Sequence, residues 1–139
     1  MYDEEIEKAV LYYIIFKEEE LDIEEEDFIN IKNKQIARAI RELKQEKQEI
    51  SILSVQNKIQ GNQKQILEYI SSLGDNVYGI TADDCYNKLK GLSKKRKVFE
   101  LAQSILSDIT EKENIDIYIQ DCVDKLNKIE KINLKEKTF

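Results

Sequence analysis

Residues 81–109 read TADDCYNKLKGLSKKRKVFELAQSILSDI. Apolar side chains recur in this stretch at alternating three- and four-residue steps, the pattern of a helix that packs along one seam. Thr81 and Asp84 resemble the capping box that starts a helix. After a polar turn at 111–114, the same spacing returns at Ile115, Ile119, Cys122, Leu126 and Ile129. Two such helices joined by a short loop predict an antiparallel helical hairpin.

Shorter amphipathic segments precede the hairpin. Asp3 is a good N-cap for a first helix, and an acidic connector follows at 18–27. A second helix is expected over about 33–47, and a short third one begins at Ser54 as its cap and ends at Gly61. A further short helix stops at Gly74, and the segment 74–79 is the clearest boundary in the chain.

We therefore expect an all-α fold with three parts. A small orthogonal helical globule spans 1–78, a long antiparallel hairpin spans 79–132, and a frayed polar tail spans 133–139. The residues expected in the core are Ile6, Val10, Ile14, Phe28, Ile36, Ile40, Leu43, Ile70, Ile119, Cys122 and Leu126.

The composition favours this fold and limits the class of protein. The 139 residues make one domain and contain no proline, no tryptophan, no histidine and four glycines. No apolar run has the roughly 20 residues that a membrane span needs, and no signal-peptide pattern is present. The expected location is the cytoplasm, without a membrane partner.

Charge is unevenly distributed along the chain. The first thirty residues hold twelve acids against Lys8 and Lys17, a net charge of −10, whereas the whole chain carries −6, so the rest carries +4. An acidic N-terminal part repels nucleic-acid phosphates, so strong direct DNA binding is not expected. It suits a protein partner with a basic face, although it could simply keep a domain in solution.

The run 94–97, KKRK, with Lys88 and Lys90 nearby, is the main basic feature. On a helix its four members point around most of a turn, so they form no single stripe. The simplest reading is a solvated face of the hairpin. Docking against an acidic protein surface and nucleic-acid binding are the alternatives.

No catalytic constellation is present in the sequence. Without histidine the chain lacks the common general base, and its four isolated glycines form no phosphate-binding loop, so neither ATP binding nor enzymatic activity is expected. Cys85 and Cys122 would lie some 25 Å apart along the hairpin, too far for a disulfide, and are read as small core side chains. No cofactor and no metal are expected.

The first hairpin helix carries two apolar strips, but one antiparallel helix can cover only one of them. The other strip must pack on the globule or on a second copy of the chain. The residues assigned to a hairpin dimer interface are Leu92, Val98, Phe99, Leu101, Ile105 and Leu106.

Segments in order along residues 4–130 resemble the N-terminal domain of DnaB-type replicative helicases. Residues 5–15 are similar to its E-A-E-x-x-V-L-G start, and 26–43 to its D-F-Y-x-x-x-H-[RK]-x-I-F-x-A-[IM] helix. Residues 50–55, 69–73 and 96–105 resemble the segments that follow. This chain has Tyr12 in place of the usual Gly, Asn33 in place of His and Ala37 in place of an aromatic residue.

The resemblance implies a role in DNA replication, in the primosome. In that family hairpins pair two copies, and three pairs form a collar above the hexameric motor. The collar docks the C-terminal helicase-binding domain of primase and, in some systems, a helicase loader. ATP hydrolysis belongs to a separate RecA-like domain. Two alternatives stay open: the helicase-binding C-terminal domain of a primase, and a stand-alone helical homodimeric adaptor.

Overall fold

The structure, a computed structural model, describes residues 1–132, and within that range every regular element is helical. The elements are α1 (Glu4–Phe16), η1 (Glu25–Asp27), α2 (Ile31–Gln45), α3 (Ile52–Lys58), α4 (Gln63–Ser71), α5 (Ala82–Asp108), η2 (Ile109–Glu111) and α6 (Ile115–Glu130). The predicted all-α fold with a helical hairpin is confirmed. The tail expected to fray at 133–139 lies outside the described residues.

Side-chain caps set the helix starts. The Asp3 carboxylate accepts hydrogen bonds from two backbone amides of the first turn of α1, and Thr81 Oγ1 accepts one from Asp84 N, at 3.1 Å. The expectation that Ser54 caps the third helix was wrong. Ser51 is the cap: its Oγ accepts a hydrogen bond from Ser54 N, and Ser51 N donates one to Ser54 Oγ, which is a reciprocal capping box.

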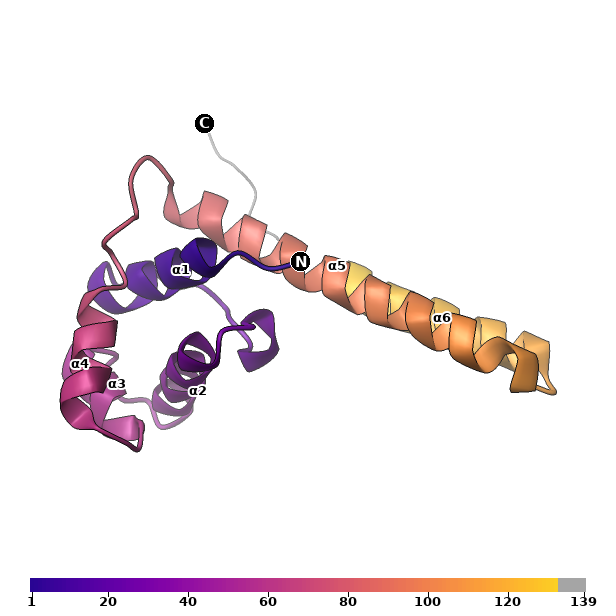
Figure 1. Cartoon of the computed structure of the whole chain (residues 1–139), viewed down its shortest axis with the longest axis horizontal. Coiled ribbons are helices and arrows are strands. Elements are labelled where there is room, and N and C mark those ends of the chain that lie inside the picture. Colours follow the sequence, from indigo (N-terminus) through magenta and orange to yellow (C-terminus); the bar gives the residue numbers. More distant parts are fainter. Residues whose placement is uncertain (133–139) are drawn as a thin grey trace.

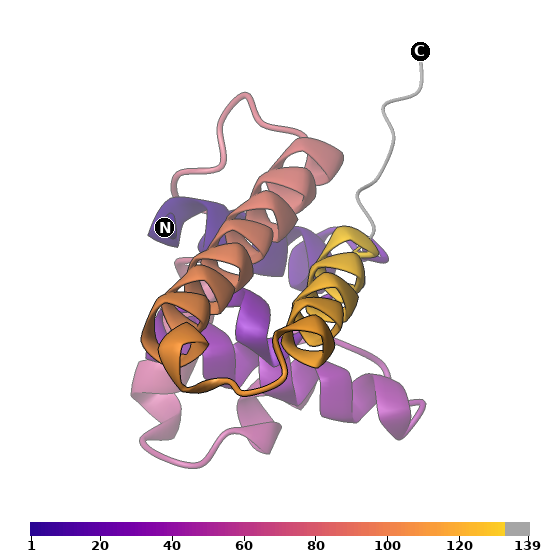
Figure 2. The same cartoon turned by 90° about the vertical axis from the view of Figure 1, so that its right-hand side faces the viewer.

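The globule is built from α1 to α4, with the first part of α5 lying along α1 (Figures 1 and 2). The contact between α1 and α5 is the most extensive in the fold. Cys85, Tyr86 and Leu89 of α5 are buried in the same core as α1 and α2. The rest of α5 and α6 project beyond the globule as the hairpin (Figure 1). Thus α5 belongs to both parts, and the boundary expected at 78/79 precedes a segment that completes the core.

The expected core residues fall into two groups. Those before the hairpin are all buried in one cluster: Ile6, Val10, Ile14, Phe28, Ile36, Ile40, Leu43 and Ile70. On α6, however, Cys122 is half-buried, Ile119 is 53% exposed and Leu126 is 44% exposed. The reason is that α6 packs against α5 and does not reach the globule core.

One departure from the family pattern has a structural counterpart. Tyr12 stacks on Phe16, with ring centroids 5.3 Å apart, and its ring lies directly over Gly74. A Cβ atom at position 74 would lie 2.5 Å from Tyr12 Cε1, a severe overlap. Gly74 therefore provides the space that an aromatic ring at position 12 requires.

Candidate functional site

The hairpin carries an exposed apolar surface on each of its helices. On α5 it consists of Val98, Phe99, Ala102, Leu106 and, just past the helix end, Ile109; on α6 it consists of Ile115, Ile119, Val123 and Leu126. Phe99 is 50% and Leu106 is 80% exposed. These nine residues are called the hairpin face below. Scattered apolar residues on a surface are ordinary, but a continuous apolar face points to an interaction site.

The two halves of the hairpin face lie on the same side of the hairpin. On α5, Leu101 lines the groove with α6 and so marks the side that faces α6. Viewed along the helix axis, the α5 residues of the hairpin face lie about 60–160° around the helix from Leu101. On α6, the half-buried Cys122 marks the side that faces α5. The α6 residues of the hairpin face lie about 20–100° around the helix from Cys122, in the same sense of rotation. Because α5 and α6 run antiparallel (Figure 2), the same sense of rotation from their facing sides leads to one common side of the hairpin.

The six residues expected to form a dimer interface do not all lie on this face. Val98, Phe99 and Leu106 do. Leu101 is only 9% exposed and lines the groove between α5 and α6, so it belongs to the inside of the hairpin. Leu92 and Ile105 are half-buried. The periodicity of α5 did not distinguish the strip that meets α6 from the strip that faces outward.

A buried ion pair joins the hairpin to the globule. Lys90 Nζ of α5 lies 2.6 Å from Asp27 Oδ2 of η1, and the two side chains are 6% and 2% exposed. Asp27 Oδ2 also accepts a hydrogen bond from Glu24 N. The Lys90 ammonium lies 5.6 Å from the ring centroid of Tyr86. The carboxylate and the ring together replace the water that the ammonium loses on burial.

Two residues of the basic run extend this junction. Arg96 donates to the backbone carbonyls of Met1, Glu26 and Asp27, and Lys97 Nζ pairs with Glu26 Oε1 at 2.8 Å. The reading of this run as a solvated face is therefore wrong for these two residues. They dock against acidic surface, and that surface is the chain's own.

The acids of the first thirty residues are accordingly divided between structural and exposed groups. Beside Glu26 and Asp27, Glu24 pairs with Arg41 and Glu25 with Arg38. The hydrogen bonds from Arg38 lower the pKa of the Glu25 carboxyl. Four further acids between α1 and η1 have exposed side chains, and we call them the acidic loop: Glu18, Glu19, Glu20 and Asp22.

A second buried carboxylate, which the sequence analysis did not single out, lies inside the globule. Glu7 is 1% exposed and accepts hydrogen bonds from Ile29 N at 2.9 Å, Asn30 N at 3.2 Å and Asn33 Nδ2 at 3.0 Å. Tyr69 donates its hydroxyl to Asn33 Oδ1. Burial, followed by the nearby carboxylates of α1, raises the pKa of Tyr69 to about 12, so the hydroxyl remains a donor.

Comparison with known proteins assigns the family. The sequence model of the DnaB-like helicase N terminal domain matches residues 1–90. The chain belongs to this family. It therefore has a replicative helicase N-terminal role, and this domain is a non-catalytic part of such helicases. No curated protein matches the sequence.

The DnaB-like match ends within α5, so it covers the globule and the first third of α5 but leaves out Arg96, Lys97 and most of the hairpin. Within residues 1–132, no helix is both long and apolar enough to cross a membrane, and no group of three or more Cys, Asp and Glu side chains is placed to hold a metal ion.

Proposed function

We propose that this DnaB-like domain is an assembly and partner-docking unit of the replicative helicase. Its hairpin face pairs with that of a second copy, and in the full-length helicase three such pairs form the hexamer collar. The collar then docks the C-terminal helicase-binding domain of primase and, in some systems, a helicase loader. The observation that carries the proposal is the apolar hairpin face, which no part of residues 1–132 covers.

Burial of this face supplies the free energy for pairing. Transferring a large apolar side chain out of water contributes roughly 1.5–3 kcal/mol when it is fully buried. A two-fold pairing buries each residue of the face on both copies at once. Leu106 is 80% exposed in the single chain, so its side chain has the largest exposed fraction of this face to bury on pairing.

The first test replaces Leu106→Asp or Phe99→Asp. Each change places two carboxylates in the paired interface and removes two large side chains, so association is expected to weaken at least about a hundredfold. Light scattering after size exclusion should show a dimer for the wild type and a monomer for either variant. Circular dichroism should show an unchanged helix content.

A matched control is Ile117→Asp on α6. Ile117 is 61% exposed but lies on the other side of α6 from the hairpin face, so this variant should remain dimeric. A wild-type chain that stays monomeric at high micromolar concentration, or an Ile117→Asp variant as monomeric as Leu106→Asp, would count against pairing through this face.

Docking of primase is the second part of the proposal, and we place it at the acidic loop, whose four carboxylate side chains are exposed. We expect the chain to retain the helicase-binding domain of the primase from the same organism at low salt, and to retain less of it as salt rises. Exposed charges at the edge of an interface mainly increase the association rate. Replacing Glu18, Glu19 and Glu20 by glutamine should therefore slow association by about three- to tenfold, measured by surface-immobilised binding kinetics.

The control for this experiment replaces Glu111→Gln and Glu113→Gln at the hairpin turn, far along the chain from the acidic loop. These changes should leave the association rate with primase near that of the wild type. A chain that pairs normally but binds no primase domain at any salt concentration would favour the stand-alone homodimeric adaptor.

A further inference from the structure

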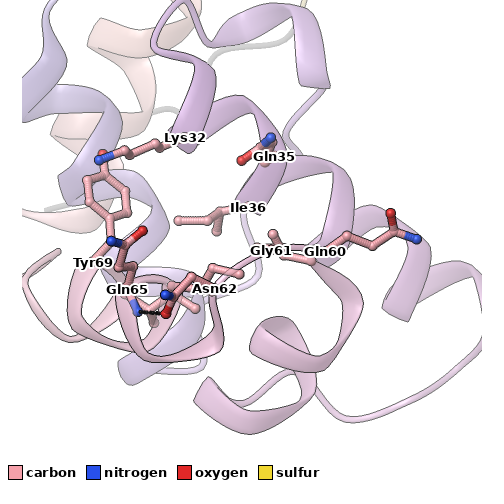
Figure 3. A pocket seen from close by; sticks show the side chains of 11 residues that line it. Lys32, Gln35, Ile36, Gln60, Gly61, Asn62, Gln65 and Tyr69 are labelled. Atoms are coloured by element: carbon pink, nitrogen blue, oxygen red, sulfur yellow. Dashed lines mark hydrogen bonds between the residues drawn. The ribbon is translucent and has the colours of Figure 1, made fainter.

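A small pocket opens between α2 and the α3–α4 segment (Figure 3), and no residue of the hairpin face or the acidic loop lines it. Its floor is apolar and is formed by Ile36, Ile59, Ile66 and Ile70. The Tyr69 ring forms one wall, and Lys32 extends from α2 above it (Figure 3). We propose that this pocket docks a peptide segment of a partner protein that presents one large apolar side chain next to a carboxylate. This proposal does not depend on hairpin pairing or on primase.

The volume of the pocket limits the occupant. It encloses about 190 Å³, below the roughly 300–1,000 Å³ that is usual for small-molecule and cofactor sites. A single aliphatic or aromatic side chain is a better match to this space than a nucleotide or a cofactor. The isoleucine floor favours such a side chain through the apolar area that it removes from water.

The charge at the mouth favours a carboxylate next to that side chain. Lys32 is the one charged residue among the eleven that line the pocket, and none of the eleven is acidic. Its ammonium lies 5.1 Å from the centroid of the Tyr69 ring. Lys8 Nζ lies 5.8 Å from the same centroid but is already paired with Glu4 and Glu5, so Lys32 is the cation that can receive a carboxylate. An exposed cation–π contact is weak, so the Lys32 ammonium can move to an incoming carboxylate at little cost.

The rim favours a polypeptide over a lipid or a simple organic acid. Side-chain amides of Gln35, Asn62 and Gln65 lie at the opening, whereas the Gln60 side chain extends away from it (Figure 3). An amide group both donates and accepts hydrogen bonds, so it can pair with the backbone N–H and C=O groups that a bound peptide brings with it. The acyl chain of a fatty acid has no hydrogen-bond donors or acceptors to pair with these amides.

The walls of the pocket are held in place before any ligand arrives. Tyr69 is fixed by its hydrogen bond to Asn33, which in turn donates to the buried Glu7. The turn at Gly61 has φ +136°, a conformation that side-chain-bearing residues rarely adopt, and Asn62 caps α4 by accepting from Gln65 N. A preformed site loses less conformational freedom on binding, which raises the affinity for a short peptide.

The test is a titration of the ¹⁵N-labelled full chain with a capped Asp-Phe-Asp-Leu peptide, followed by amide chemical shifts. Shifts should concentrate on α2 and on residues 59–70. A capped Asn-Phe-Asn-Leu peptide should bind about three- to tenfold more weakly, and Lys32→Glu should weaken the acidic peptide by a similar factor. Lys64→Glu, an exposed lysine of α4 outside the pocket lining, is the matched control and should have little effect.

Three results would overturn the proposal. The first is the absence of shifts at the pocket with millimolar acidic peptide. The second is equal binding of the neutral peptide, or equal loss with Lys32→Glu and Lys64→Glu, because either would show that Lys32 does not recognise a carboxylate. The third is movement of the same pocket signals on dilution of the chain alone, which would assign the pocket to a second copy.

Discussion

Replacing Asp27→Ala is expected to lower the free energy of unfolding by about 3–5 kcal/mol. The change leaves the Lys90 ammonium, which is 6% exposed, without its carboxylate partner. It also removes the acceptor for Glu24 N, a hydrogen bond within the cap of η1. Urea unfolding followed by circular dichroism measures the loss. The protein concentration must be fixed, because pairing adds stability that depends on concentration.

A neighbouring pair provides the control. Glu26 and Lys97 join the same two elements at 2.8 Å, but this pair is open to water, with the Lys97 side chain 28% and the Glu26 side chain 62% exposed. Glu26→Ala should therefore lower the free energy of unfolding by less than about 1 kcal/mol. The double replacement Asp27→Leu with Lys90→Met should recover much of the loss, because it removes both buried charges together. Equal losses of unfolding free energy for Asp27→Ala and Glu26→Ala would refute the claim that the buried pair contributes more to stability than the exposed one.

The parts of the fold that the sequence predicted are those governed by local interactions. Caps at Asp3 and Thr81, the glycine after α4 and the three- and four-residue spacing of α5 and α6 all act within a few residues of chain. The acidic connector at 18–27 was also recognised, and η1 forms at its end. These signals were enough for the fold class and the hairpin.

The errors arose where burial depends on partners far away in the sequence. The same apolar spacing describes a side chain that packs inside the hairpin, such as Leu101, and one that faces outward, such as Leu106. Ile119 and Leu126 have the period of core residues, yet α6 has only α5 to pack against. A periodic apolar pattern therefore predicts that one side of a helix will be buried. It does not predict whether the same chain or a second molecule buries it.

Two buried charged residues had a recognisable but unused sequence signal. Glu7 precedes Val10 and Ile14 at three- and four-residue spacing, on the buried side of α1. Lys90 lies four residues after Tyr86 and three residues before Ser93, on the buried side of α5. A charge on an apolar helical stripe indicates a buried partner elsewhere. Its identity, Asp27 for Lys90, could not be predicted because 63 residues separate the two.

Glu7→Ala should destabilise the fold by an amount similar to Asp27→Ala, for a different reason. Three donors lose their acceptor together, namely the backbone amides of Ile29 and Asn30 and the side-chain amide of Asn33. Each donor left buried and unsatisfied costs about 1–3 kcal/mol, and these costs are not fully additive, so a total loss of about 3–5 kcal/mol is expected. The same urea unfolding experiment measures it.

Two variants separate lost hydrogen bonds from other effects of the Glu7 change. Glu7→Gln keeps the shape but puts an N–H₂ group where one acceptor oxygen was, so it should cost about 1–3 kcal/mol, less than Glu7→Ala. Glu5→Ala removes an exposed carboxylate from the same turn of α1 and should change the free energy of unfolding by less than about 1 kcal/mol. If Glu7→Ala proved as mild as Glu5→Ala, water would have to replace the carboxylate as the acceptor, and the junction between α1 and the start of α2 would be open to solvent.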